Sequence, residues 1–226
     1  LEDLLEKVSQ VESADEDINQ KKKEIHSVSE KLDVIGLKIS NARKKVIPNL
    51  KKELESLLSD LGMKNARFSI NIKSTSHYFS NGKDELEFFF SANKGGNFGE
   101  LKKVASGGEL SRIMLAVKRV LSENTQLPTI IFDEIDTGVS GEISNKIAAI
   151  MLQMSKHMQV ISITHLPQVA AKGDNHYKVY KEEINNVTTT NLRQLTAEER
   201  IVEIAEMLSG KEISETAITH AKELLN

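Results

Sequence analysis

The chain has 226 residues, a formal net charge of -3, 28% charged residues, only 4% aromatic residues and no cysteine. The lack of cysteine excludes a disulfide framework and thiolate metal sites, and no run of about 18 apolar residues is present to span a bilayer. The small negative charge provides no overall basic field for nucleic acid, so DNA contacts would need local patches such as 21–23, 43–45 or 102–103.

The first 61 residues predict a long helix with a coiled-coil seam, because apolar residues recur at every seventh position. The positions in this seam are Leu4, Val11, Ile18, Ile25, Leu32, Ile39 and Val46. A second seam is ragged: Val8, Ala14, Val28, Ile35 and Ala42 are interrupted by Asp15, Lys22, Ser29 and Gly36. We therefore expect a coiled-coil arm over 1–61 whose stability depends on a partner helix.

No second heptad segment follows, so the partner helix is expected in another chain or in a missing amino-terminal portion. The start at Leu1, inside a helical pattern with no capping residue before it, also favours a fragment. Pro48 removes a helix hydrogen bond and disfavours helical geometry at Ile47, which predicts a kink or an end of the arm there. Gly62 is expected to stop the helical pattern.

The remaining segment, 62–226, predicts an α/β fold. Strand-like runs at 66–73 and 85–92 flank a turn at Asn81-Gly82 and indicate a hairpin. After a glycine-containing loop, helices alternate with short apolar strands, which favours a parallel sheet. The expected strands are 129–132 and 160–163, the expected helices are 109–123, 141–156, 197–208 and 215–225, and a second hairpin is expected over 177–181 and 187–195.

A phosphate-contacting site is predicted at Ser106, Gly107, Gly108 and Glu109, at the start of an amphipathic helix. Free backbone N–H groups and the positive end of the helix dipole converge there and favour phosphate oxygens. Alone, this S-x-x-E pattern is better explained as a simple capping box. The two glycines favour a ligand, because Gly early in a helix costs about 0.5 to 1 kcal/mol relative to Ala but permits close backbone approach.

Two adjacent carboxylates, Asp133 and Glu134, follow the apolar run 129–132. A buried parallel strand would carry them to its carboxyl end, where ligands bind in open α/β sheets. Adjacent strand residues point in opposite directions, so one can face Mg²⁺ while the other addresses a water. A strand end followed by an acidic turn is an equally simple interpretation. His165 follows the second apolar strand and is expected at the same edge, which ranks it above the other five histidines.

The segment from Asp136 to Gly141 connects the carboxylates to the next helix. Its residues Gly138, Ser140 and Gly141 suit a sharp loop with a capped helix start, which taken alone is ordinary. The order of the motifs is more specific than any one of them. A glycine-rich helix start, a strand ending in Asp-Glu, a loop, a helix and a strand ending in Thr-His together favour a nucleotide site.

With this order of motifs the chain resembles the ATP-binding-cassette (ABC) superfamily, and the attached coil points to its SMC-like branch. The strings VASGGELSR, FDEIDTGVSG and THLPQVAA resemble the RecN family of bacterial DNA repair proteins, strongly over 98–181 and only in composition elsewhere. The resemblance implies that 62–226 is the carboxy-terminal lobe of an ABC/SMC-type ATPase head. Its mostly parallel sheet would be flanked by helices, and the coiled-coil helix would precede it.

The resemblance also implies roles for individual residues, with ATP and Mg²⁺ as cofactors. Asp133 in the Walker B strand would help to hold Mg²⁺, and Glu134 would orient and deprotonate the attacking water. His165, as the switch histidine, would contact the γ-phosphate. The signature at 106–109 would close over ATP held by a second head. The D-loop, with Asp136, Gly138 and Ser140, would line that dimer interface.

One part of the family's site is missing, since the phosphate-binding pattern G-x-x-x-x-G-K-[ST] occurs nowhere in the chain. In the family this Walker A loop and the antiparallel coil helix belong to the amino-terminal half, so this chain alone is expected to be inactive. The resemblance implies a cytoplasmic, nucleoid-associated ATPase in DNA double-strand-break repair that dimerises through its heads, moves its arms on DNA and needs no membrane.

Two other readings remain open. The chain could be a structural coiled-coil assembly module that keeps the nucleotide motifs only as part of its fold, as the ragged seam and the missing phosphate loop suggest. It could also come from another SMC-like, chromosome-organising ATPase, although the short arm argues mildly against that. No DNA recognition motif is present, so DNA contacts would be made to phosphates by lysines and would weaken with salt.

Overall fold

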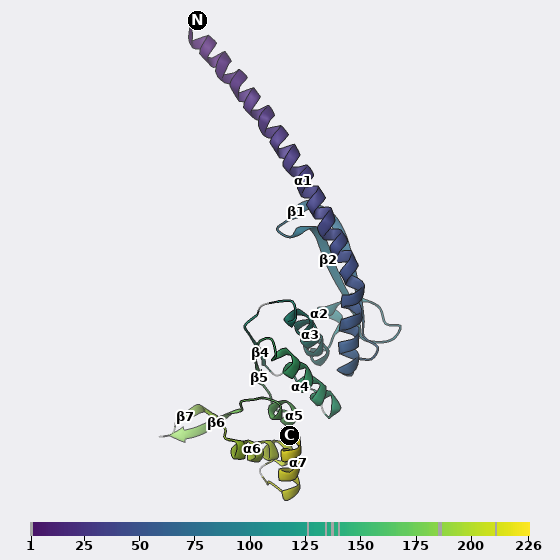
Figure 1. Ribbon diagram of the computed structural model, residues 1–226, viewed down its shortest axis with the longest axis vertical. Coiled ribbons are helices and arrows are strands. Elements are labelled where there is room, and N and C mark those ends of the chain that lie inside the picture. Colours follow the sequence, from purple (N-terminus) through teal and green to yellow (C-terminus); the bar gives the residue numbers. More distant parts are fainter. Residues whose placement is uncertain are drawn as a thin grey trace. The chain divides into compact units, whose positions relative to one another are not determined.

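A computed structural model describes residues 2–125, 127–133, 135–136, 138–139, 141–184, 187–210 and 212–226, with side chains from residue 14 onward except at 102 and 184 (Figure 1). The chain forms two compact units. The arm unit comprises 1–51 and 69–88, and the lobe unit comprises 52–68 and 89–226. The hairpin 69–88, which the sequence placed with the lobe, thus groups with the arm, because its side chains bond to the arm helix.

The arm helix α1 (Glu2–Asp60) continues through Pro48 as a single helix (Figure 1). The arm therefore does not end at the proline, although proline removes one backbone hydrogen bond. Leu54 and Leu58, in the turns that follow, are buried, and this packing favours continuation of the helix. None of the described helices is long and apolar enough to cross a membrane.

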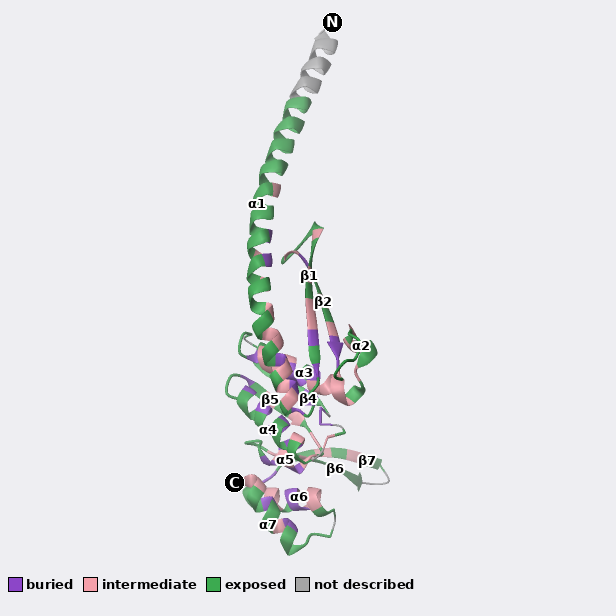
Figure 2. Ribbon diagram, turned by 90° about the vertical axis from the view of Figure 1, so that its right-hand side faces the viewer, coloured by how far each residue is buried: buried purple, intermediate pink, exposed green. Residues whose placement is uncertain are grey.

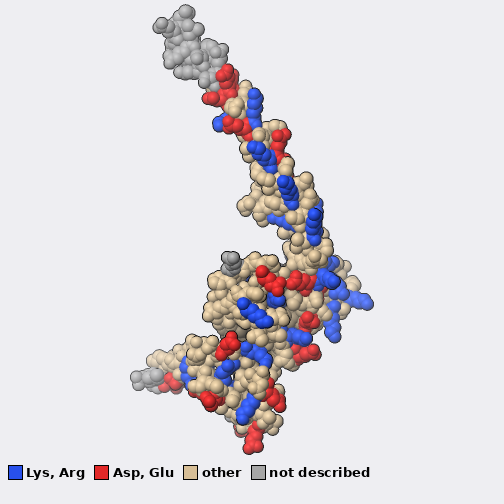
Figure 3. Space-filling model, in the orientation of Figure 1, with Lys and Arg blue, Asp and Glu red and all other residues tan. Residues whose placement is uncertain are grey.

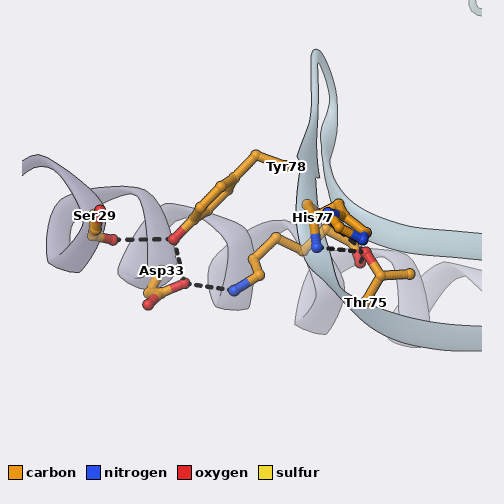
Figure 4. Close-up of polar contacts among 6 residues, drawn as sticks. Ser29, Asp33, Thr75, His77 and Tyr78 are labelled. Atoms are coloured by element: carbon orange, nitrogen blue, oxygen red, sulfur yellow. Dashed lines mark hydrogen bonds and ion pairs between the residues drawn. The ribbon is translucent and has the colours of Figure 1, made fainter. Parts of the chain in front are cut away.

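The hairpin consists of β1 (Arg67–Phe79) and β2 (Gly82–Ser91), which are longer than predicted, and only its part 69–88 belongs to the arm unit. Its tip bonds to α1: Tyr78 donates to the Asp33 carboxylate (2.7 Å) and to the carbonyl of Ser29 (3.3 Å), as Figure 4 shows. Gly36 is buried, and a Cβ there would lie 3.5 Å from Lys83 Cδ. Ser29 and Gly36, which interrupt the second seam, therefore belong to the surface of α1 on which the hairpin lies.

The end of α1 lies in the lobe unit, which begins at Lys52. Met63 N–H donates to the Leu58 carbonyl (2.8 Å) and Gly62 N–H to the Ser59 carbonyl (3.1 Å), with Gly62 at φ +83°. This is a Schellman end, which confirms the predicted stop at Gly62. Phe68 and Phe90 then pack with ring centroids 5.3 Å apart in the core. Two short elements that the sequence did not predict follow, β3 (Gly99–Glu100) and α2 (Leu101–Val104).

A parallel strand pair forms the centre of the lobe unit and confirms the predicted strand direction. β4 (Thr129–Asp133) and β5 (Gln159–Ile163) pair in parallel. The helices α3 (Gly107–Ser122) and α4 (Glu142–Met154) match the predicted ranges to within two residues. Both are amphipathic, and each buries the apolar side that faces the core, including Ile113 and Ile147.

The carboxy-terminal part contains α5 (Pro167–Ala171), the antiparallel hairpin β6 (Tyr177–Ile184) and β7 (Val187–Gln194), α6 (Ala197–Ser209) and α7 (Glu215–Leu225). The helix α5 is short and was not predicted. Four alanines and one isoleucine pack α5, α6 and α7 together in a buried cluster of Ala171, Ile204, Ala205, Ala217 and Ala221. The Arg200 guanidinium donates to the Gly173 carbonyl (2.6 Å) and so holds the loop that leads to β6.

Candidate functional site

The predicted site begins at the carboxyl ends of β4 and β5. Asp133 ends β4, lies exposed, and stands opposite Ile163, the last residue of β5. Thr164 and His165 follow directly. The parallel register therefore brings the segment after Asp133 and the segment after Ile163 to one edge of the sheet. The alternation of helices and strands in the sequence predicts this arrangement.

Asp136 is the centre of the polar contacts at this edge. Asp136 is fully buried, with 0% of its surface exposed. The Thr164 hydroxyl donates a short hydrogen bond to Asp136 Oδ2 and accepts one from Leu166 N–H at 3.0 Å. The other oxygen, Oδ1, lies 3.7 Å from His165 Nδ1 and has no hydrogen-bond partner among the described residues. Asp136 thus ties the loop after β4 to the segment after β5 in the same chain.

His165 combines this internal contact with exposure to solvent. Its side chain is 63% exposed, and its Nδ1 is the ring nitrogen that faces Asp136. A carboxylate near Nδ1 favours the tautomer with the proton on that nitrogen, which leaves Nε2 as an acceptor or, when the ring is charged, as a second donor. The geometry therefore places Nδ1 beside a buried carboxylate in a ring whose side chain is accessible to a ligand.

The loop between β4 and α4 depends on glycine. Gly138 has φ +74° and Gly141, which precedes α4, has φ +58° with ψ -123°, a combination that strongly favours glycine. The Val139 N–H donates to the carbonyl of Asp136 at 3.3 Å, so the chain turns sharply after the buried carboxylate. Glu134 and Ser140, which were predicted to act in catalysis and in the D-loop, lie outside the described residues.

The predicted phosphate-contacting helix start forms the capping box that its sequence suggests. The Ser106 hydroxyl accepts from Glu109 N–H (3.4 Å), and the Glu109 carboxylate accepts from Ser106 N–H (2.8 Å). A Cβ added at Gly107 would meet nothing within 4 Å, so the backbone there stays open to approach. Among the described residues, no hydrogen bond or ion pair joins this helix start to the edge that carries Asp133 and His165.

The donor set fits Mg²⁺ and a nucleotide in kind. Mg²⁺ prefers one or two carboxylates together with phosphate and water oxygens, and Asp133 presents an exposed carboxylate at the strand end. No group of three or more potential metal ligands is found among the described residues, which do not include Glu134. Ser106 and Gly107 present an accessible helix start, which suits phosphate oxygens.

Thr164 is the residue whose role sequence reasoning missed. In the sequence, Thr164 stands out only as the residue between the expected strand 160–163 and His165. The signal was available, because Thr164 and His165 are adjacent and should point to opposite sides, so one can anchor the segment while the other faces solvent.

The basic patches are partly neutralised. Lys21 pairs with Glu24 (2.8 Å), Arg43 with Asp84 (2.8 Å) and Lys103 with Glu100 (3.0 Å). Asp84 is buried, so Arg43 is committed to an internal contact. The lysines that remain exposed on α1 are the stronger candidates for contacts with another molecule.

Comparison with known proteins finds relatives that match nearly the whole chain. The chain is 38% identical over 225 residues to DNA repair protein RecN of Halalkalibacterium halodurans, which covers 98% of this chain and 40% of the relative. It is 37% identical to RecN of Bacillus subtilis, over 97% of this chain and 41% of the relative. The chain is homologous to RecN. It spans about two fifths of these RecN proteins and corresponds to their carboxy-terminal part. No family model matches the chain.

Solved structures show the fold of this RecN homologue. The Smc head domain with a coiled coil and joint from Pyrococcus yayanosii has a TM-score of 0.60 at 18% identity and covers 81% of this chain and 34% of that one. An Smc head domain with an extended coiled coil from Pyrococcus furiosus, bound to the carboxy-terminal domain of ScpA, has a TM-score of 0.57 at 18% identity, over 81% of this chain and 44% of that one. The predicted fold class, an SMC-type head lobe with a coiled-coil helix, is confirmed.

Proposed function

We propose that this chain is the carboxy-terminal part of an SMC-like ATPase that acts in DNA double-strand-break repair. The single observation that carries the proposal is the edge of the parallel pair β4–β5. There Asp133 ends one strand, His165 follows the other, and the buried Asp136 carboxylate connects the two segments through Thr164. The homology to RecN supports the assignment to DNA repair.

The residues have separate chemical tasks in this proposal. The Asp133 carboxylate would hold Mg²⁺, and that ion would neutralise phosphate charge of a bound ATP. Glu134 accepts the proton of the attacking water. His165 contacts the γ-phosphate through Nε2 and keeps its ring orientation through the contact of Nδ1 with Asp136. The helix start at Ser106 and Gly107 binds the nucleotide of a second head, and the loop around Gly138 and Ser140 lies at that dimer interface.

The amino-terminal half of the full-length protein is the proposed partner that supplies the phosphate-binding loop. One face of the strand pair supports this. Ile131 is 62% exposed, Ile161 42% and Ile163 54%, and the register places Ile131 opposite Ile161. Parallel strands are normally covered on both faces, so an exposed isoleucine face beside Asp133 suits a second lobe.

DNA is the proposed substrate of the assembled protein, held through its phosphates by exposed lysines of the arm or head. Such contacts are sequence-independent, so affinity should fall steeply with added salt. Lys22, Lys23, Lys44 and Lys45 are exposed and have no ion-pair partner among the described residues. We place the protein in the cytoplasm, at the nucleoid.

The test joins this chain with the amino-terminal portion of a RecN relative and measures ATP turnover. We expect turnover in the joined protein, none in the chain alone, and loss of turnover in Glu134→Gln with a longer-lived ATP-bound dimer, because the general base is removed while binding is kept. Asp15→Asn, on the exposed distal arm, is the charge-matched control and should leave turnover unchanged.

Unchanged hydrolysis in Glu134→Gln would remove Glu134 as the base. Neither ATP binding nor hydrolysis by the joined protein would instead favour a structural coiled-coil assembly module. A third outcome is that the joined protein turns over ATP at a rate that damaged DNA does not change, and that it organises intact chromosomal DNA. This outcome would favour another type of SMC-like ATPase.

A further inference from the structure

Within the arm unit, the hairpin holds a segment of α1 from Ser29 to Arg43, here called the hairpin-bound segment. At one end, Tyr78 donates to the Ser29 carbonyl (3.3 Å) and to the Asp33 carboxylate (2.7 Å). At the other end, Arg43 donates to the Asp84 carboxylate at 2.8 Å. These contacts are spread over about four helical turns, so this part of α1 is supported along its length by a second element.

Within the lobe unit, the last turns of α1 are fixed in a different way, by apolar burial. Leu54 is 2% exposed and Leu58 is 0% exposed. The Glu55 carboxylate also accepts a hydrogen bond from Phe68 N–H at 2.9 Å, which connects the helix to the start of β1. This lobe-bound segment, 54–60, cannot change its direction without opening the core of the lobe unit.

The linking segment, 44–53, joins these two supported segments. None of its side chains is buried, and Figure 3 shows Lys and Arg side chains along the surface of α1. Pro48 lies near its centre and cannot donate a hydrogen bond to the carbonyl of Lys44. The boundary between the two compact units falls between Lys51 and Lys52, about one turn after the proline. The interrupted hydrogen-bond ladder therefore coincides with a stretch that no buried side chain keeps straight.

The hairpin strands also continue from one unit into the other, β1 between Phe68 and Ser69 and β2 between Phe88 and Phe89. The third strand, β3, pairs with β2 at Phe89 and Phe90, inside the lobe unit. Toward its tip the hairpin is therefore a ribbon of two strands, the form of sheet with the largest twist between neighbours. Such a ribbon can follow a bend of α1 more readily than a wider sheet could.

We propose that α1 bends at Pro48, and that this bend changes the direction of the arm while the hairpin-bound and lobe-bound segments keep their contacts. Sharp bends in long helices occur where the ladder of backbone hydrogen bonds is interrupted, most often at proline. The inference rests on the proposed function for its purpose, because an ATPase that moves its arm on DNA needs a defined point at which the arm turns. The bend itself requires neither ATP nor a second head.

Gly36 also weakens the helix, but it lies in the hairpin-bound segment. It is buried, and a Cβ added there would lie 3.5 Å from Lys83 Cδ. Hydrogen bonds to the hairpin at Ser29 and at Arg43 lie on either side of it along the helix. A bend at Gly36 would break these contacts, whereas a bend at Pro48 leaves them in place. The position of the support, and not helix propensity alone, therefore selects the proline.

The experiment measures a distance along α1 in the whole chain. The chain contains no cysteine, so Lys31→Cys and Asp60→Cys introduce two spin-label sites at exposed positions on either side of Pro48. A straight helix would place them about 44 Å apart along its axis. Pulsed electron paramagnetic resonance gives the distribution of this distance. We expect a broad distribution with a tail to shorter distances, and roughly half that width after Pro48→Ala, which restores the hydrogen bond to Lys44.

Two control variants separate the proline from general helix propensity. Asn49→Ala improves the propensity beside Pro48 without restoring the hydrogen bond to Lys44, and Gly36→Ala improves it within the hairpin-bound segment. Both should leave the width of the distribution unchanged. Circular dichroism checks that all variants keep the helix content of the labelled chain.

An equal width before and after Pro48→Ala would overturn the proposal, and so would a narrow distribution in the labelled chain without further substitution. Equal narrowing by Asn49→Ala or by Gly36→Ala would also overturn it, because the flexibility would then be spread along α1. A joined protein without ATPase activity would count against the proposed function and leave the distance result as it stands.

Discussion

Different interactions stabilise the interior of each unit. Every buried apolar side chain among the described residues lies in the lobe unit, whereas the buried side chains described in the arm unit are those of Ser40 and Asp84 (Figure 2). The lobe unit is stabilised by apolar burial, which depends little on salt or pH. The hairpin of the arm unit is held on α1 by hydrogen bonds and ion pairs, so its attachment should respond to single polar substitutions.

Among the described residues, each unit has one buried carboxylate, Asp84 in the arm unit and Asp136 in the lobe unit, and the two differ in their partners. Asp84 accepts a hydrogen bond from the Arg43 guanidinium at 2.8 Å. Asp136 accepts from the neutral Thr164 hydroxyl and leaves one oxygen near His165 without a hydrogen bond among the described residues. A carboxylate paired with a guanidinium suits a structural role, while a carboxylate with a spare oxygen beside an exposed histidine suits the positioning of that histidine.

The largest stability effect is expected from Asp84→Asn. The substitution leaves Arg43 without its carboxylate, and because the Arg43 side chain is only 23% exposed, water compensates incompletely. We expect the hairpin to lose about 2 kcal/mol of local stability. Hydrogen exchange of the β1 and β2 amides within 69–88 should rise by more than tenfold, while exchange in β4 and β5 stays unchanged.

Glu87→Gln is the control for this prediction. It removes the exposed ion pair between Lys73 and Glu87 on the same hairpin, where side chains are 62% and 33% exposed, and should cost no more than about 0.5 kcal/mol. Equal effects of the two substitutions, or faster exchange in the lobe as well, would show that the arm unit is not held mainly by its polar contacts.

A smaller stability effect is expected from Asp136→Asn, less than about 1 kcal/mol, because Asn keeps the shape and its oxygen can still accept from Thr164. Its amide group would then face His165 Nδ1 and favour a ring with the proton on Nε2. Long-range proton–nitrogen NMR spectra, at a pH where the ring is neutral, should show this change of tautomer for His165 and for no other histidine. The same tautomer in both proteins would exclude Asp136 as a positioning residue.

The lobe was the more predictable of the two units. The apolar runs 129–132 and 160–163 and the helices around them carry their structure in local periodicity, so both their type and their limits followed from the sequence. The short helix α5 did not follow from the sequence, because five residues are too few to show a helical periodicity. The arm was predicted as a helix, but the role of Ser29 and Gly36 was not, since contacts with a hairpin about 50 residues away leave no local pattern.

The site was predictable in part for the same reason. Strand direction placed Asp133 and His165 at one edge, which follows from the order of elements alone. The burial of Asp136 against Thr164 depends on how the glycine-containing loop between β4 and α4 folds back. Neither an aspartate nor a threonine in the sequence predicts that contact. Sequence could rank the histidines but could not show which nitrogen of His165 faces a carboxylate.

The smallest effect tests the outer end of the hairpin, where Asp33 meets Lys83 and Tyr78 (Figure 4). The hydrogen bond from Lys83, and then that from Tyr78, lowers the pKa of Asp33 below its ordinary 3.8. The hydrogen bond to Asp33 in turn raises the pKa values of Lys83 and Tyr78. A lowered carboxyl pKa means that this contact stabilises the folded arm unit above about pH 4 and is lost as the pH falls through the lowered value.

The raised pKa values of Lys83 and Tyr78 matter at high pH. Both groups stabilise the contact while they are protonated, and this stabilisation is lost as the pH rises through their raised pKa values. Carboxyl carbon NMR titration should therefore give an Asp33 pKa that rises toward the ordinary value in Lys83→Met and rises less in Tyr78→Phe. Methionine keeps most of the apolar stem that lies against Gly36, so the first variant isolates the charge. An Asp33 pKa that moves in neither variant would mean that the tip is not held at α1 in solution, and the Arg43–Asp84 pair would then carry the attachment of the hairpin.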